Sequence, residues 1–267
     1  MSQVLIVGSV CNDGVPISLP RTSAPMSTES KTLRIHLLPP PEGLPRTDLA
    51  VIVDVLRAST TIASALHAGA ECVVPCLTIE AAREAAVTRG ALLGGERGGV
   101  KVDGFDFGNS PTEYCSEKVA GKTIAFTTTN GTKALQLSLA SREIVIGAFA
   151  NLSGVTERCA VEPQVDIVCA GTDGAISAED VLFAGLLGSR LTDFHAFKPA
   201  DDATGIAIDF SRANTENPPR LLEAVRQSQG GKNLIKLGYD ADIQFAANID
   251  RFSIVPTYDA ESGSIRV

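Results

Sequence analysis

A buried strand that ends in a burst of polar residues constrains this chain more than any other feature. Residues 49–53, Leu-Ala-Val-Ile-Val, are wholly apolar, as in a core strand. The polar octet Asp54-Val-Leu-Arg57-Ala-Ser59-Thr60-Thr61 follows at once, and residues 58–69 have the pattern of a helix. A helix N-terminus offers unpaired N–H groups and a partial positive charge, so it attracts anions, and Arg57 adds a full positive charge. The octet therefore predicts an oxyanion site in an α/β protein.

The rest of the chain alternates short β-branched runs with helical patterns. The runs predict further strands at 33–38, 72–75, 91–94, 123–126, 143–147, 166–170 and 252–256. The helical patterns predict helices at 78–89, near 130, and at 151–159, 177–190 and 217–229, with a less regular segment over 196–267. This order predicts an α/β fold with mixed sheets and covering helices.

The domain organisation follows from composition along the chain. Residues 8–32 are rich in Ser, Thr, Pro and Gly, so we expect 1–30 to be a flexible N-terminal extension. No linker of that kind interrupts the remainder, and we expect 31–267 to form one bilobal unit with lobes at 31–150 and 151–267.

Composition also excludes several classes of function. A net charge of −8 argues against binding nucleic acid or an anionic membrane, and the absence of Trp weakens any base-stacking site. No apolar run approaches the roughly 18 residues of a membrane span, so we expect a cytoplasmic protein. Six cysteines without zinc spacing and three scattered histidines make a zinc site or a His-centred triad improbable.

A second polar segment runs from Gly94 to Pro111 and joins glycines, cations and carboxylates. Its glycines let backbone N–H groups approach an anion closely. Ser110 also suits the N-cap of a helix beginning at Pro111, which is the simpler interpretation of that residue. The candidates in this segment are Glu96 and Arg97 for catalysis, and Lys101, Asn109 and Ser110 for substrate binding.

Two more strands end in similar polar loops. After 123–126 come Thr128, Thr129, Asn130 and Gly131, a turn-prone loop at a helix start that suits an oxyanion. After 166–170 comes Thr172, and then Ser177-Ala-Glu179-Asp180 at the start of the next helix. Ser177 with Asp180 fits a capping box, and acidic residues in a first turn favour the helix dipole. We favour metal binding for this acidic pair, because it directly follows a strand and a glycine turn.

Together these segments predict a metal-assisted enzyme acting on a small phosphorylated acid. Asp54, Glu179 and Asp180, with Glu96 as a further candidate, can hold a Mg²⁺ ion that keeps several waters. Arg57, Arg97, Lys101 and the hydroxyl groups, including Ser59, Thr60 and Thr61, can hold the substrate's anionic groups. Phosphoryl transfer needs little beyond this positioning and charge neutralisation. The chain contains no P-loop motif, and Asp54 is not part of an Asp-x-Asp pair.

The four segments at 54–61, 95–111, 127–132 and 169–180 together resemble the 2-phosphosulfolactate phosphatase family. The resemblance covers residues 33–257 and implies a distinctive bilobal α/β arrangement. It also implies Mg²⁺-dependent hydrolysis of (2R)-2-phospho-3-sulfolactate to sulfolactate and phosphate, a step that serves coenzyme M biosynthesis in some organisms. A polyanionic substrate explains why so many cations, hydroxyls and glycine loops occur in an acidic protein.

Two other functions share most of these features. A noncatalytic binding protein for small anions would use the same loops but would not need clustered carboxylates. A phosphatase of the same fold could act on another small phosphorylated hydroxy acid, since the sequence does not distinguish a sulfonate from another distal anion. A homodimer is the expected oligomeric state of a small metabolic enzyme.

The role of Asp54 has two alternatives: it ligates the metal while water attacks phosphorus, or it attacks phosphorus itself. The missing second Asp favours water attack. A single turnover in ¹⁸O-water should then leave the Asp54 carboxylate unlabelled, as read by mass spectrometry of its peptide. Label in Asp54 would show an aspartyl-phosphate.

Overall fold

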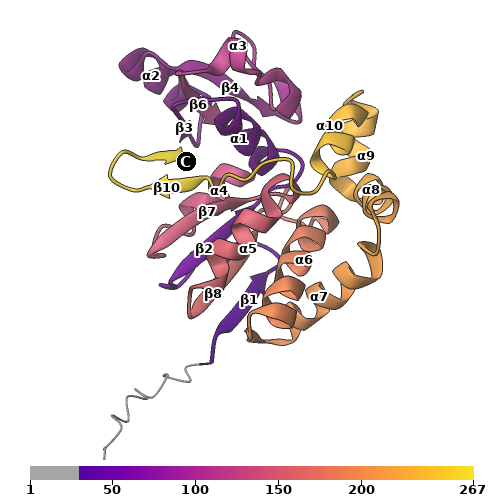
Figure 1. The fold of residues 1–267 in the computed structure, drawn as a ribbon. Coiled ribbons are helices and arrows are strands. Elements are labelled where there is room, and N and C mark those ends of the chain that lie inside the picture. The colour runs from indigo at the N-terminus through magenta and orange to yellow at the C-terminus, as the bar shows by residue number, and fades with distance from the viewer. Residues whose placement is uncertain (1–29) are drawn as a thin grey trace, which may run out of the picture.

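A sheet of eleven strands organises residues 30–267, the part of the chain that this computed structural model describes (Figure 1). The strands are β1 Thr32–His36, β2 Leu49–Val53, β3 Cys72–Pro75, β4 Leu92–Arg97, β5 Val100–Lys101, β6 Thr123–Thr127, β7 Glu143–Gly147, β8 Gln164–Cys169, β9 Lys198–Pro199, β10 Thr257–Asp259 and β11 Ser264–Arg266. Their spatial order is β5-β4-β6-β3-β11-β10-β7-β2-β8-β1-β9. The expected α/β fold with a mixed sheet is confirmed.

Ten helices accompany the strands in this part of the chain. They are α1 Ala58–His67, α2 Ile79–Arg89, α3 Ser116–Val119, α4 Gly131–Gln136, α5 Leu152–Ala160, α6 Ala178–Phe194, α7 Asp202–Asn214, α8 Pro218–Gln227, α9 Gln229–Lys236 and α10 Asp240–Ala246. Two 3₁₀ turns lie at Pro111–Glu113 and Phe149–Asn151. No helix of the described residues is both long and apolar enough to cross a bilayer.

Strand β2 lies in the middle of the larger parallel group and is buried on both faces. Side chains alternate along a strand, so Val51 and Val53 join the core beneath α5 and α6, which contains Phe183. Ala50 and Ile52 join the core beneath α1 and α4 on the opposite face. This two-sided burial explains the unbroken apolar run and leaves Asp54 as the first polar residue at the strand's end.

The C-terminal hairpin β10–β11 joins two groups of parallel strands (Figure 1). One group is β4-β6-β3 and the other is β7-β2-β8-β1-β9, and the hairpin pairs antiparallel with β3 and with β7. In the sheet, β8 lies between β1 and β2. The division into lobes at residue 150 stays a prediction, and the expected extension at 1–30 lies almost wholly outside the described residues.

The C-terminal third is more regular than the sequence indicates. Helices α7 to α10 fill most of it, and they pack against α6 and against one another. The strand expected at 252–256 is wrong, because strand pairing begins only at Thr257. Residues 252–256 instead make irregular bonds: the Phe252 N–H donates to Ala150 O, and the Asn151 side chain donates to Ile254 O.

Candidate active site

A polar cavity of about 370 Å³ lies where four strand-end loops meet α9. The loops follow β2, β4, β6 and β8, so the structure brings together all four segments on which the sequence analysis depends. The lining residues include Asp54, Arg57, Glu96, Gly98, Gly99, Asn109, Thr129, Asn130, Thr172, Asp173, Gly230, Asn233, Lys236 and Leu237.

Asp54 occupies the floor of this cavity as a buried carboxylate. Its Oδ1 accepts a hydrogen bond from the Ala58 N–H at 3.1 Å, at the start of α1. A Cβ on Gly131 would lie 2.8 Å from its Oδ2, so only glycine lets α4 begin this close to the carboxylate. Burial, with added repulsion from Glu96 and Glu179, raises the pKa of Asp54 to about 7.

Both members of the acidic pair of α6 are buried, and they lie near enough to Asp54 for the charges to interact, but neither lines the cavity. Asp180 accepts from the Val55 N–H at 2.8 Å and from the Gly171 N–H at 3.0 Å, so it ties the loops after β2 and β8 together. Burial is the main cause that raises the pKa of Asp180, and the charges of Glu179 and Asp54 raise it further. The capping interpretation does not describe Ser177, whose hydroxyl bonds Thr172 instead of the helix.

Glu179 has an oxygen without a partner. Its buried Oε2 accepts no hydrogen bond from residues 30–267, and burial raises its pKa. A Cβ on Gly230 would lie 2.0 Å from its Oε1, so the glycine allows α9 to close over the carboxylate. A buried carboxylate oxygen without a donor carries a desolvation cost that a cation would offset.

These carboxylates fit a hydrated divalent cation better than a fully protein-ligated metal. Within residues 30–267, no three His, Cys, Asp or Glu side chains have the arrangement of a metal cluster. Mg²⁺ commonly takes one or two carboxylates and completes its shell with water and substrate oxygens. Asp54 and the unpartnered Glu179 match that donor set, whereas both oxygens of Asp180 already accept backbone N–H groups.

Glu96 braces two loops rather than presenting a free carboxylate. Its Oε2 accepts from the Gly99 N–H at 2.7 Å, and its Oε1 accepts from the Thr129 N–H at 2.9 Å. Arg97 donates to the Glu96 carbonyl and to the Thr127 hydroxyl, and it is not among the cavity-lining residues. Lys101 is exposed on β5, also outside the lining.

Some of the residues predicted to bind substrate bond within the protein, and others line the cavity. Ser59, Thr60 and Thr61 turn inward and donate to the carbonyls of Ile52, Val55 and Asn109, so they brace the turn after β2. Thr128 is buried against Thr132. The predicted binding residues that do line the cavity are Asn109, Thr129, Asn130 and Thr172.

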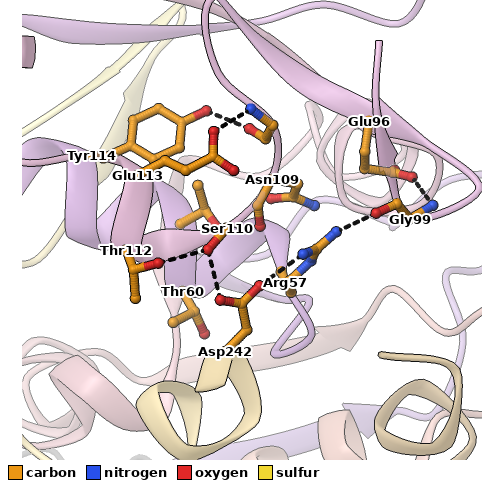
Figure 2. Close-up of polar contacts among 12 residues, drawn as sticks. Arg57, Thr60, Glu96, Gly99, Asn109, Ser110, Thr112, Glu113, Tyr114 and Asp242 are labelled. Carbon is orange, nitrogen blue, oxygen red and sulfur yellow. Dashed lines mark hydrogen bonds and ion pairs between the residues drawn. The ribbon is translucent and has the colours of Figure 1, made fainter. Parts of the chain in front are cut away.

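Arg57 is held in place by a residue that the sequence analysis missed, Asp242 of α10 (Figure 2). Its Nη1 donates to Asp242 Oδ2 at 2.7 Å, and its Nη2 donates to the Gly99 carbonyl at 2.7 Å. Its guanidinium lies 4.4 Å from the centre of the Tyr239 ring. The Arg57 and Asp242 side chains are each only 3% exposed. This buried pair joins the octet to the C-terminal helices.

Ser110 shares the same carboxylate. It precedes the Pro111–Glu113 turn as expected, but its side chain makes no capping bond. Its hydroxyl donates to Asp242 Oδ1 at 2.6 Å (Figure 2). Two hydrogen bonds of Gly108 hold the backbone just before Ser110. The Gly108 N–H donates to the Glu113 carboxylate, and the Gly108 carbonyl accepts from the Tyr114 hydroxyl. Asp242 therefore joins two of the predicted site segments.

The comparisons with known proteins agree with this geometry. A family model described as 2-phosphosulpholactate phosphatase matches residues 38–261. The chain belongs to this family. It is 43% identical to a probable 2-phosphosulfolactate phosphatase of Thermotoga petrophila over 78% of this chain and 88% of that protein. It is 38% identical to a protein of the same name from Carboxydothermus hydrogenoformans, over 87% of this chain and 96% of that one.

Because it belongs to this family, the chain is a phosphoric monoester hydrolase, as its motifs indicate. The matched span begins just after β1 and ends beyond β10, so it includes α9 and α10. These two helices supply Gly230, Asn233, Lys236 and Asp242, which the sequence analysis did not single out. The one signal available was indirect: a buried Arg57 requires a carboxylate partner from elsewhere in the chain.

Removing Asp242 should cost far more stability than removing its neighbour Asp240. Asp242→Ala leaves the buried Arg57 charge without a partner, which we expect to lower the unfolding free energy by about 3–5 kcal/mol. Asp240, on the same helix as Asp242, pairs with Arg226 of α8, but the Asp240 and Arg226 side chains are 40% and 34% exposed, so Asp240→Ala should cost at most ~1 kcal/mol. Urea unfolding of both variants measures the difference, and equal losses would contradict the assignment.

Proposed function

We propose that this protein is a Mg²⁺-dependent phosphatase that hydrolyses (2R)-2-phospho-3-sulfolactate to 3-sulfolactate and phosphate. The observation that carries the proposal is the buried Asp54 at the base of a cavity lined by anion-binding donors, near Glu179, whose Oε2 has no hydrogen-bond partner among residues 30–267. The names of the similar proteins support the substrate. A cytoplasmic location, a homodimer and a role in coenzyme M biosynthesis are parts of the same proposal.

The charges of the cavity support the need for a cation. Its lining carries the carboxyl groups of Asp54, Glu96 and Asp173, against the cations of Arg57 and Lys236. A substrate with phosphate, carboxylate and sulfonate groups would bring several more negative charges into this space. A divalent ion held by Asp54 and Glu179 would offset both sets of negative charge. When bound, Mg²⁺ would supply electrostatic stabilisation of the phosphoryl oxygens and lower the pKa of water.

The chain's own groups would hold the phosphoryl group. Asn109, Asn130 and Thr172 line the cavity and carry amide or hydroxyl donors for its oxygens, whereas the Thr129 hydroxyl donates to Glu96. Arg57 adds a fixed positive charge, which Asp242 and Gly99 orient. Water is the proposed nucleophile: its oxygen bonds to phosphorus, the bond from phosphorus to the substrate's C2 oxygen breaks, and one proton of the water ends on that leaving oxygen. Positioning of this kind supplies most of the catalysis in phosphoryl transfer.

The clustered carboxylates favour this function over a noncatalytic anion-binding protein. When Asp54, Glu179 and Asp180 are ionised, their burial lowers the free energy of unfolding. A protein that only binds anions would gain nothing from them. Another phosphorylated hydroxy acid as substrate is the closer competitor, because the donors that hold phosphate do not depend on the distal group.

Phosphate release from 2-phospho-3-sulfolactate tests the proposal directly. We expect activity with Mg²⁺ that EDTA abolishes and added Mg²⁺ restores. Asp54→Asn and Glu179→Gln should lower kcat by roughly 10³-fold or more, since each removes a group acting on the transition state.

The control is Glu157→Gln, which changes an exposed carboxylate on α5 outside the cavity and should retain full activity. Circular dichroism should show that all three variants are folded. Tight binding of the substrate without turnover in Mg²⁺ would instead support the anion-binding alternative.

A further inference from the structure

Helix α9 supplies a cation to the cavity that the proposed chemistry at phosphorus does not use. Arg57 and Lys236 are the two lining residues with positively charged side chains. Both terminal nitrogens of Arg57 donate within the protein, to Asp242 and to Gly99. Lys236 makes no hydrogen bond or ion pair with any of residues 30–267, so its ammonium group is available to a ligand.

The position of α9 is fixed at both ends by the active site. At its start, Gly230 lies against Glu179, where a Cβ would approach Oε1 to 2.0 Å. Just beyond its end, Leu237 lies against Gly99, where a Cβ would approach Leu237 Cδ1 to 2.7 Å. Asn233 and Lys236 are three residues apart, share one face of the helix, and both line the cavity. The helix therefore presents an amide and an ammonium group to bound substrate.

We infer that Lys236, together with Asn233, binds the sulfonate group of the substrate and so determines specificity. This inference rests on the proposed function. The ammonium of Lys236 offers three donors and a full charge, which suit a sulfonate. Asn109, Asn130 and Thr172 come from the strand-end loops around Asp54 and would hold the phosphoryl group. The distal anion meets α9, the only part of the lining that comes from the C-terminal helices of the described chain.

The test compares two substrates that differ only in the distal anion, 2-phospho-3-sulfolactate and 2-phospholactate. The measured quantity is the ratio of their kcat/KM values. Lys236→Gln should lower this ratio about tenfold or more, through a higher KM for the sulfonated substrate, as expected for the loss of one charge-assisted hydrogen bond. Lys236→Arg should restore much of the preference.

Lys232→Gln is the matched control, because Lys232 is exposed on the same helix, one turn earlier, and does not line the cavity. It should leave the ratio unchanged, and thermal melts should show that all variants are folded. A wild-type ratio in Lys236→Gln would overturn the inference while leaving the proposed function intact.

If the wild type releases no phosphate, the proposed function is refuted. A second measurement then tests the inference about Lys236 independently of that function. Calorimetry of 3-sulfolactate binding to the wild type and to Lys236→Gln then tests the helix directly. We expect at least about tenfold weaker binding by the variant. Equal affinities would overturn the inference.

Discussion

Burial of clustered carboxylates is the constraint on which the rest of this structure depends. Asp54, Glu179 and Asp180 come from two separate strand-to-helix junctions, and burial raises the pKa of each. Neighbouring carboxylates raise the pKa values of Asp54 and Asp180 further. For Asp54 the folded-state pKa of about 7 exceeds the ordinary value of 3.8. The folded protein therefore loses stability as the pH rises between these values, because the unfolded chain ionises first. The proposed divalent cation would remove this cost by stabilising the ionised form.

The surrounding chain is arranged to keep those carboxylates in place. Asp180 takes one N–H from the loop after β2 and one from the loop after β8. Glu96 does the same for the loops after β4 and β6. The C-terminal helices complete the arrangement: Asp242 pairs with Arg57 and orients it, and α9 closes over Glu179. The site is thus assembled from segments far apart in the sequence, with charge pairing as the common device.

The sequence predicted the part of this architecture that depends on local patterns. The strands at 49–53, 72–75 and 143–147 are confirmed to the residue, since a buried parallel strand reads as an unbroken apolar run. The sequence also indicated that the four polar loops lie together, because the carboxyl ends of parallel strands lie at the same edge of a sheet. What local patterns could not show was the direction in which each side chain points. Ser59, Thr60 and Thr61 look like ligand groups in the sequence, but they bond to the backbone of their own turn and of Asn109.

Of the C-terminal helices, only α8 was predicted, by the helix expected at 217–229, and α7, α9 and α10 were missed. Helices α9 and α10 are short, and Gly230-Gly231 lies at the start of α9, where glycine disfavours a helix. The roles of Asp242 and Lys236 depend on long-range contacts with Arg57 and with the cavity, which no spacing in the chain encodes.

The most direct test of the account is the pKa of Asp54, measured by ¹³C NMR titration of its carboxyl carbon and assigned with Asp54→Asn. In protein stripped of metal, the account predicts a pKa of about 7, and a marked fall when Mg²⁺ is added. An ordinary pKa near 3.8 in the stripped protein, or a raised pKa that Mg²⁺ leaves unchanged, would contradict the claim that these buried carboxylates form a cation site.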